Sequence, residues 1–365
     1  MISGDRPTHL LSLVSLAGIL ALLSFALWPV FLTSLGREWG LSNTDIGFVS
    51  GAYFLGYLLA TPILVGLTDR IDARLIFLGG CGFGAVGCLG FALLARDFWS
   101  AASCWALVGA GLAGTYMPGL QILNARLDDA ARVRSVPWYT ACFGIGTGAS
   151  FALMGVLLAF ADWRLAAYLG AGGAILAAML VLFLVQSCPV APLPAKKKKR
   201  HPLDLRPAFR KPVALGYIFA YGTHTYELFA FRTWSFALLV FLGNRADGGM
   251  GIGTVTIIVS LITVTGMLSS LLGARLCLAF GRHRVITLIG GATALVSVIV
   301  AYSLDGPVWI AVAGLWIYNG FIMLDSGALT TGTVEAGDAY DRGALLAVHS
   351  MIGFGGGALG GPVVG

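Results

Sequence analysis

Charged residues are scarce in this sequence, and their scarcity excludes most protein classes. Only 11% of the 365 residues are Asp, Glu, Lys or Arg, whereas 58% are hydrophobic and the mean hydropathy is +0.86. In water-soluble domains about a quarter of all residues are charged, so the class of water-soluble proteins is excluded. The sequence therefore predicts an all-α polytopic membrane protein whose surroundings are the lipid bilayer.

The residue patterns of several chemistries are also missing. The six cysteines lie in or beside apolar runs without metal-ligand spacing, which predicts buried free thiols and no metal or other cofactor. HExxH, the nucleophile elbow and a catalytic carboxylate cluster are absent, so we expect no enzyme. The net charge of +6 follows from the sidedness of the cations, so we expect no nucleic-acid partner.

Apolar runs of bilayer length, separated by turn residues and charges, predict eleven membrane-spanning helices. Two glycine-rich runs inside them, Gly82–Gly87 and Gly109–Gly114, match the dinucleotide fingerprint formally. No strand precedes either run, so we interpret these glycines as sites of close helix packing. The predicted spans are residues 10–35, 45–67, 75–95, 99–124, 136–160, 165–187, 213–242, 251–274, 284–303, 307–331 and 344–365.

The distribution of cations predicts the orientation. Most of the 23 Lys and Arg residues fall in loops that are cytoplasmic if the N-terminus lies inside the cell, and the densest cluster is Lys196–Arg200. Short cytoplasmic loops collect such residues. We therefore expect a multi-pass protein of the inner (plasma) membrane with a cytoplasmic N-terminus.

One predicted span carries ionisable residues in its middle. The run Gly216–Phe241 is otherwise apolar but contains His224, Glu227 and Arg232. A charge in hydrocarbon costs roughly 3 kcal/mol on insertion scales, so such residues are kept where they face a polar cavity or a partner. On an α-helix, Tyr221, His224 and Arg232 share one face and Glu227 lies on its edge. This face either binds substrate and protons or pins helices together through neutralising pairs, and we favour binding.

The loop between the second and third predicted spans has the sequence GLTDRIDAR, residues 66–74. It resembles the signature loop of the major facilitator superfamily, the twelve-helix secondary transporters, because Asp69, Arg70 and Arg74 stand at the positions of that motif. Asp72 departs from it, since the family has a glycine there. The resemblance implies that Asp69, Arg70 and Arg74 form a gating loop that latches in one state of the transport cycle.

Two further motifs match the family only in part. Gly109 and Gly111 resemble the glycines of its fourth helix, but Trp105 replaces the leading arginine, so no proton-relay role is carried over. The fifth span has the glycines of Gly144–Gly148, but Ala149 replaces the proline of the antiporter signature. The antiporter version is therefore broken.

A linker rich in proline and lysine divides the chain. The glycine pattern of Gly144–Gly148 recurs at Gly353–Gly357, an offset of 209 residues, which supports two pseudo-symmetric six-helix bundles. The same offset predicts a twelfth helix near 374–396, and this chain ends before it. Either the natural protein is longer or it is an eleven-helix variant, and we favour a longer natural protein. The expected parts are an N-terminal bundle, a basic cytoplasmic linker and a C-terminal bundle, at residues 1–188, 189–211 and 212–365.

In the family, helices 1, 4, 7 and 10 line the transport cavity, and the resemblance extends this to polar residues here. For Gln121 and Asn124, a hydrogen bond between helices is an equal alternative. The proton-coupling residues would be Glu227 and His224. The substrate contacts would be Arg232, Tyr221, Asn319, Gln121, Asn124 and Tyr116.

The resemblance implies alternating access, and we predict a monomeric permease that carries a small organic or inorganic anion by proton symport. The stretch HTYELFAFRTW, residues 224–234, is similar to bacterial permeases grouped with cyanate and nitrite carriers. A first alternative is cation or drug efflux by proton antiport, with Glu227 as the charge acceptor. A second is a non-transporting membrane sensor on the same fold.

Overall fold

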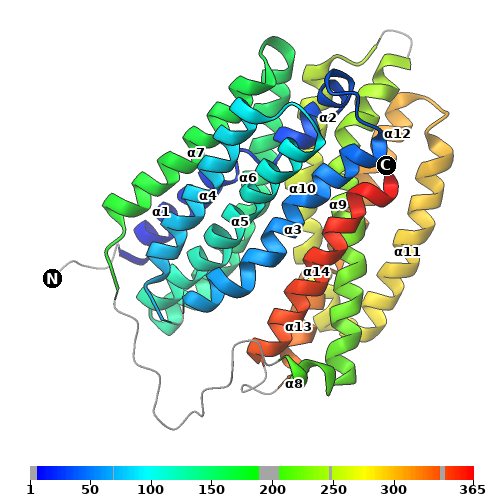
Figure 1. Ribbon diagram of the computed structural model, residues 1–365. Coiled ribbons are helices and arrows are strands. Elements are labelled where there is room, and N and C mark those ends of the chain that lie inside the picture. The colour runs from blue at the N-terminus through cyan, green and yellow to red at the C-terminus, as the bar shows by residue number, and fades with distance from the viewer. Residues whose placement is uncertain (1–5, 69, 189–204, 246–248, 338–341) are drawn as a thin grey trace. The chain divides into compact units, whose positions relative to one another are not determined.

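A computed structural model describes all residues except 1–5, 69, 189–204, 246–248 and 338–341. The described residues form helices and connecting loops, without a strand (Figure 1). The helices are α1 (Arg6–Ala21), α2 (Leu27–Glu38), α3 (Asn43–Leu67), α4 (Ala73–Leu94), α5 (Phe98–Arg126), α6 (Asp129–Phe160), α7 (Trp163–Leu184), α8 (Arg206–Phe209), α9 (Pro212–Arg245), α10 (Ile252–Phe280), α11 (Arg282–Ser303), α12 (Val308–Leu324), α13 (Ser326–Glu335) and α14 (Arg342–Val364).

Ten helical segments of the described chain are long and apolar enough to cross a membrane. They overlap the ten predicted spans from 45–67 to 344–365, so the all-α polytopic fold class is confirmed. The first predicted span, residues 10–35, differs because it is divided into α1 and α2.

The break between α1 and α2 is supported by a serine from a distant helix. Ser150 of α6 is fully buried, accepts a hydrogen bond from the Ala26 N–H at 2.9 Å and donates one to the Leu23 carbonyl at 2.6 Å. A helix can be interrupted in a membrane where side chains satisfy the freed backbone groups. Ser150 is such a side chain, and it was not predictable from residues 10–35 alone.

A second break occurs within the predicted span 307–331. Asp325 separates α12 from α13, with φ −94° and ψ −11°. Its carbonyl accepts a hydrogen bond from the N–H of Leu329 at 2.9 Å. The chain therefore continues in a helical path, and the interruption of the α-helix is confined to Asp325. The carboxylate at this break lies in the interior of the helical bundle, with a side-chain exposure of 17%.

The chain separates into two compact units. Unit 1 comprises Met1–Leu27, Ala52–Leu153 and Ala161–Leu203, and unit 2 comprises Trp28–Gly51, Met154–Phe160 and Asp204–Gly365. The division at a basic linker, residues 189–211, stays a prediction, because residues 189–204 of that linker lie outside the described residues.

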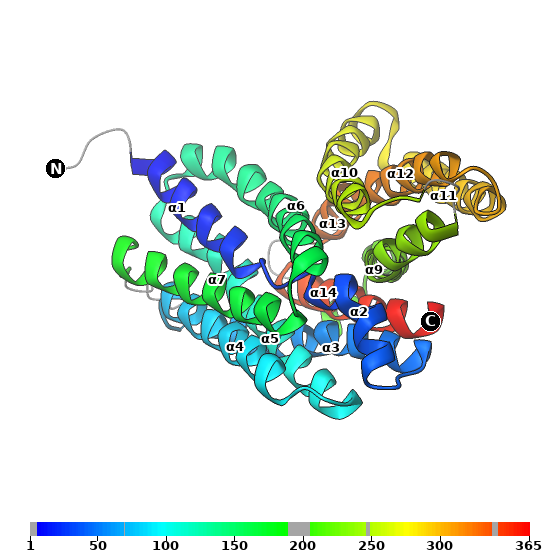
Figure 2. The same ribbon diagram turned by 90° about the horizontal axis from the view of Figure 1, so that it is seen from above.

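In unit 1, α4 packs against α5 and α7, and α1 packs against α5 and α7 (Figure 2). Most glycines that match the dinucleotide fingerprint lie at helix contacts. A Cβ atom on Gly111 would lie 2.7 Å from the backbone N of Gly84, and one on Gly114 would lie 2.6 Å from the Cα of Gly80. The interpretation as packing sites is therefore confirmed for the run Gly109–Gly114, whereas in the run Gly82–Gly87 the first glycine has open space beside it.

In unit 2, α9 is the central helix and packs against α10, α12, α13 and α14. Its contact with α14 is made by small residues: a Cβ atom on Gly356 would overlap the carbonyl oxygen of Gly222. The hydroxyl of Thr225 donates to the Gly353 carbonyl at 2.6 Å. The glycines of α14 thus let its backbone approach the helix that carries the ionisable residues.

We expect Gly109→Ala to lower the thermal stability of the purified protein, because its Cβ atom would overlap the backbone oxygen of Tyr53 on α3. Overpacking of this kind costs about 1–3 kcal/mol. The matched control is Gly82→Ala on α4, where a Cβ atom meets nothing within 4 Å and alanine raises helix propensity. Thermal unfolding in detergent measures both, and equal stability of the two variants would contradict the packing role.

Candidate functional site

The ionisable residues of α9 lie inside unit 2. His224 and Arg232 are buried, at 4% and 7% exposure, and Tyr221 and Glu227 are half-buried. A helix with one polar side can be stable in an apolar surrounding only when that side meets polar partners. The partners that the structure gives them come from α12, α13 and α14.

His224 pairs with the carboxylate at the break between α12 and α13. Its Nδ1 lies 2.8 Å from Oδ1 of Asp325. The sequence predicts His224 as a proton-coupling residue from its position in an apolar run, but it does not identify Asp325 as the partner. The depth of the two residues in the membrane is the signal that could have found this pair. An acid inside a membrane span requires a partner at the same depth, and both residues lie in apolar spans.

Glu227 has a different partner, on α12. The hydroxyl of Tyr318 donates to Oε1 of Glu227 at 2.6 Å. The Tyr318 ring also meets Phe231 edge-on, with centroids 5.8 Å apart. A carboxylate held by a tyrosine hydroxyl can gain or lose a proton without leaving its place, because the hydroxyl can donate to the charged form and accept from the neutral one.

Tyr221 stacks on two histidine rings. Its centroid lies 5.8 Å from that of His224 and 3.8 Å from that of His349 on α14, with interplanar angles of 16° and 14°. The structure therefore brings the predicted pair Tyr221 and His224 together. It adds His349, which the sequence did not place at the site.

Two threonines of α13 hold the buried His349. The hydroxyl of Thr333 lies 3.1 Å from Nδ1 and that of Thr330 lies 3.2 Å from Nε2. Both hydroxyls also donate to carbonyls of their own helix segment, Thr333 to Leu329 at 3.0 Å and Thr330 to Ser326 at 3.4 Å. Both ring nitrogens of His349 thus have a hydroxyl partner, and the imidazole joins α14 to α13.

Arg232 lies on α9 with its guanidinium carbon 5.8 Å from the Phe229 ring centroid. Tyr221 lies three helical turns earlier on the same helix, so about 16 Å of helix axis separates the two residues. The structure therefore places both members of the predicted anion-binding pair in unit 2 without direct contact between them. Whether the pair binds substrate stays a prediction.

Asn319 of α12 is buried, and its Nδ2 donates to the carbonyl of Ile262 on α10 at 2.9 Å. A Cβ atom on Gly266 would lie 2.7 Å from the same amide nitrogen, so the side chain is seated against α10. The amide group therefore joins two helices, and its role in substrate binding stays a prediction.

The remaining predicted substrate contacts lie on α5 in unit 1. Tyr116 stacks on Tyr139 at 6.0 Å and lines a small pocket with Thr115 and Phe143. Gln121 and Asn124 contact each other, with Nδ2 of Asn124 3.5 Å from Oε1 of Gln121. The structure thus separates the candidates into a polar group in unit 2 and an α5 group in unit 1.

The predicted gating loop is described in part. Asp69 lies outside the described residues, and Arg70 is exposed. Arg74 reaches the end of α7, where its Nε donates to the Val181 carbonyl at 3.3 Å and its Nη2 to the carbonyl of Leu182. Arg74 therefore fastens the start of α4 to the end of α7.

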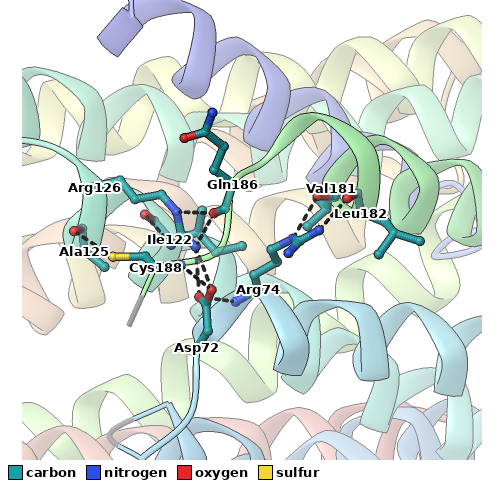
Figure 3. A network of polar contacts seen from close by, with 9 residues as sticks. All are labelled: Asp72, Arg74, Ile122, Ala125, Arg126, Val181, Leu182, Gln186 and Cys188. Carbon is teal, nitrogen blue, oxygen red and sulfur yellow. Dashed lines mark hydrogen bonds and ion pairs between the residues drawn. The ribbon is translucent and has the colours of Figure 1, made fainter. Parts of the chain in front are cut away.

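The centre of this network is Asp72, one of the residues that depart from the family motif (Figure 3). Nη2 of Arg126 donates to both of its carboxylate oxygens, at 2.9 and 3.0 Å. The backbone N–H of Cys188 donates to Oδ2 at 2.7 Å and that of Arg74 to Oδ1 at 3.0 Å. Nε and Nη2 of Arg126 also donate to the Gln186 carbonyl, at 3.1 and 2.8 Å. One carboxylate thus joins the start of α4, the end of α5 and the segment after α7.

These contacts change the acidity of Asp72. Burial disfavours its charged form, but the N–H groups of Cys188 and Arg74 and the guanidinium of Arg126 outweigh burial and lower the pKa of the carboxyl below its usual value. The aspartate is therefore ionised and fully bonded near neutral pH.

Unit 2 has a corresponding pair with the charges exchanged. Arg282, the first residue of α11, bonds Glu335, the last residue of α13, through Nη1 to Oε2 at 2.7 Å and Nη2 to Oε1 at 3.1 Å. Glu335 follows Arg126 by the 209 residues of the internal repeat, and Arg282 follows Asp72 by one more. Sequence comparison of the two loops missed this acid, because it lies at the end of a helix and not in the loop.

Unit 2 therefore combines ionisable side chains that have polar partners with a buried arginine. Among the described residues, no group of three or more His, Cys, Asp or Glu side chains could hold a metal ion. The arrangement supplies two acid–base pairs, His224 with Asp325 and Glu227 with Tyr318, together with Arg232.

We expect the stability difference between the wild type and Asp72→Asn to depend on pH. The folded-state pKa of Asp72 is depressed, so its contribution is present above the unfolded value of about 3.9 and is lost as the pH falls through the folded value. Thermal unfolding at pH 7 should show a less stable variant, and the difference should narrow at the lowest pH that keeps the protein soluble. The exposed Asp305→Asn is the control. A difference that stays constant with pH would refute the charge network as its cause.

Comparisons with known proteins agree with this architecture. The family model described as Major Facilitator Superfamily matches residues 13–361. "Probable sphingolipid transporter spinster homolog 1" of Arabidopsis thaliana is 28% identical over 170 residues, which is 43% of this chain and 30% of that protein. "Protein spinster homolog 1" of Xenopus laevis is 23% identical over 263 residues, 67% of this chain and 49% of that protein. The matched regions thus span half or less of these curated relatives.

Two solved structures share the fold. A bacterial homologue of the human lysosomal transporter Spinster superposes with a TM-score of 0.76 at 16% identity, over 98% of this chain and 82% of that one. The nucleoside transporter NupG gives 0.74 at 16% identity, over 97% and 89%. Ten helices of the described chain are long and apolar enough to cross a membrane, and the family model covers nearly the whole sequence, so this chain is a multi-pass membrane protein that belongs to the Major Facilitator Superfamily.

Proposed function

We propose that this transporter carries a small organic or inorganic anion together with protons. The observation that carries the proposal is the buried Arg232 on the same helix as the acid–base residues His224 and Glu227. An arginine stays protonated in almost any protein environment and matches carboxylates and oxyanions in geometry, so it suits an anionic ligand. Burial of such a charge is tolerated where it serves binding.

In this proposal Arg232 and Tyr221 bind the anionic group, and Asn319 contributes from α12. Tyr116, Gln121 and Asn124 are substrate contacts from unit 1, as the family resemblance implies. Glu227 and His224 take up and release the coupled proton. Asp69, Arg70 and Arg74 act as the gating loop, and the transporter works as a monomer in the plasma membrane with its N-terminus in the cytoplasm.

Proton coupling is supported by the neighbours of the two proton-binding residues. Glu227 is half-buried with one hydrogen bond from Tyr318, and His224 faces the carboxylate of Asp325. The charged form of each residue thus lies beside a group that compensates it, a hydroxyl donor for the Glu227 carboxylate and a carboxylate for the His224 imidazolium. An anion that enters with protons also avoids building up charge across the membrane.

A second candidate substrate is an amphiphilic cation, with Glu227 as its charge acceptor. Two features support it: the name of the Arabidopsis relative refers to sphingolipid transport, and α9 carries aromatic side chains beside its polar side. A sphingoid base combines an amine with a long apolar chain. The two candidates differ in the sign of the ligand charge, so a single binding experiment separates them.

We expect small carboxylates or inorganic anions to raise the unfolding temperature of the purified protein and Arg232→Ala to abolish that rise. A ligand at 100 times its dissociation constant adds about 2.7 kcal/mol of stability, which thermal unfolding resolves easily. The matched control is Arg245→Ala, an exposed arginine at the end of the same helix that also lies over a phenylalanine ring, at 5.4 Å. Arg232→Lys, which keeps the charge, should retain part of the rise. Stabilisation by amphiphilic amines alone would favour the second candidate.

We expect Glu227→Gln to stop uphill uptake driven by a pH gradient in proteoliposomes while exchange of substrate between the two sides continues. Glutamine keeps the size of the side chain and its bond to Tyr318 but binds no proton. Glu38→Gln, at an exposed position on α2, should behave as the wild type. Gradient-driven uptake that survives in Glu227→Gln would remove this residue from the coupling mechanism.

A further inference from the structure

Tyr221 is held by its ring, while its hydroxyl group has no partner in the protein. The ring stacks on the imidazoles of His224 and His349, with interplanar angles of 16° and 14°. Within the part of the chain that the structure describes, the half-buried hydroxyl makes no hydrogen bond. A buried tyrosine hydroxyl usually has such a bond. The ring contacts therefore fix the residue, and the hydroxyl remains available to a ligand.

The ring of Tyr221 is seated against α14. Its centroid lies 3.8 Å from that of His349, below the separation of about 4.5–7 Å usual for aromatic pairs, so the two rings are pressed face to face. One turn later on α14, a Cβ atom on Gly353 would overlap the Tyr221 ring, so the ring also touches bare backbone. Close packing of this kind leaves the ring no room to tilt toward α14. The plane of the phenol is therefore set by α14.

The register of α9 and α14 is fixed beside this seat. The hydroxyl of Thr225, one turn after Tyr221, donates to the Gly353 carbonyl at 2.6 Å. The glycines of α14 also let its backbone touch that of α9. A shift of α14 along α9 would break the hydrogen bond of Thr225 and bring larger side chains into the contact. His349 therefore stays level with Tyr221.

The imidazole of His349 is itself fixed from a third helix. The hydroxyls of Thr333 and Thr330 on α13 lie 3.1 Å from its Nδ1 and 3.2 Å from its Nε2. Hydrogen bonds at imidazole nitrogens lie close to the ring plane, so two of them determine that plane. The residue is 3% exposed, and the ring is enclosed by protein. The two threonines of α13 therefore set the orientation of the surface on which Tyr221 stacks.

We propose that His349 is a positioning residue for substrate binding, whose stacked imidazole holds the Tyr221 ring in the orientation that presents its hydroxyl to the substrate. The proposal rests on the proposed function, in which Tyr221 contacts the transported anion. It adds the group that orients this contact and the two threonines that fix the group. His349 acts through Tyr221 and does not contact the substrate.

The benefit of this arrangement is a side chain that is ordered before the substrate arrives. A side chain that can turn must lose that freedom when it binds, and the loss weakens binding. The stacked imidazole removes this freedom in advance. Loss of the imidazole should therefore weaken binding about fivefold, the usual cost of ordering one side chain. Loss of the Tyr221 hydroxyl itself should weaken it about tenfold, because a hydrogen bond to a charged ligand is lost.

Fluorine NMR tests the positioning without any substrate. The intact protein is labelled with meta-fluorotyrosine, and the Tyr221 signal is assigned by its loss in Tyr221→Phe. His349→Ala should move this signal toward that of an exposed fluorotyrosine, because the stacked ring is gone. Thr330→Val keeps the side-chain size but loses one bond to His349, so it should move the signal in the same direction by less. The matched control is Phe354→Ala, which removes another ring that α14 stacks on α9, 6.3 Å from Phe229, and should leave the signal in place.

A double-mutant cycle separates positioning from a general structural role. Binding of nitrite, an inorganic anion, and of acetate, a carboxylate, is measured as the rise in unfolding temperature with concentration. Tyr221→Phe and His349→Ala should each weaken binding as stated. In the double variant, His349→Ala should add nothing to Tyr221→Phe, because the hydroxyl through which it acts is already gone. Phe354→Ala should leave the affinity unchanged.

An unmoved Tyr221 signal in His349→Ala, or losses of affinity that add in the double variant, would overturn the proposal. If His349→Ala does not fold, the same measurements on Thr330→Val decide. The failure of the proposed function is distinguishable, because the NMR signal reports the Tyr221 ring without any ligand. Stabilisation by neither anion would count against anion transport, whereas a Tyr221 signal that moves in His349→Ala would still support the positioning of the ring.

Discussion

The structure depends on one constraint: an apolar bilayer offers no water to a polar group, so each such group in a span must find its partner within the protein. α9 shows this most clearly, since Thr225, His224 and Glu227 meet partners on α14, at the α12–α13 break and on α12. The polar residues therefore determine which side of α9 faces which neighbouring helix. The glycines of α14 allow its backbone to come close enough to α9 for these contacts to form.

Hydropathy predicts the spans because insertion depends on the apolar content of a segment and not on its neighbours. The ends of α4, α7 and α11 accordingly lie within a few residues of their expected positions. The two breaks could not be predicted in this way. The one between α1 and α2 relies on Ser150, which is 127 residues from the carbonyl it binds, and a local pattern carries no information about such a partner.

The same distinction applies to the site. The cost of a charge in hydrocarbon marks His224, Glu227 and Arg232 from the sequence alone. Their partners depend on the packing of α9 against other helices, which no helical projection of a single span describes. Asp325 illustrates the difficulty. On a continuous helix it lies off the face of Asn319, but it falls at a break, where its side chain meets His224. In the loop before α4, comparison with the family marked Asp72 as a departure, yet that carboxylate holds three segments together.

Acid and base occupy swapped positions in the pairs Asp72–Arg126 and Arg282–Glu335, and this difference shows what an internal repeat retains. An ion pair is stabilised by complementary charges, and either order of the two satisfies that condition. The requirement on each unit is therefore complementarity between the start of one helix and the end of another, not identity with the other unit. Arg126 and Glu335 keep the repeat offset of 209 residues while their charges are opposite. A search for the acidic loop motif fails in the second half for this reason, although the physical link that the motif provides is present at the corresponding helix ends.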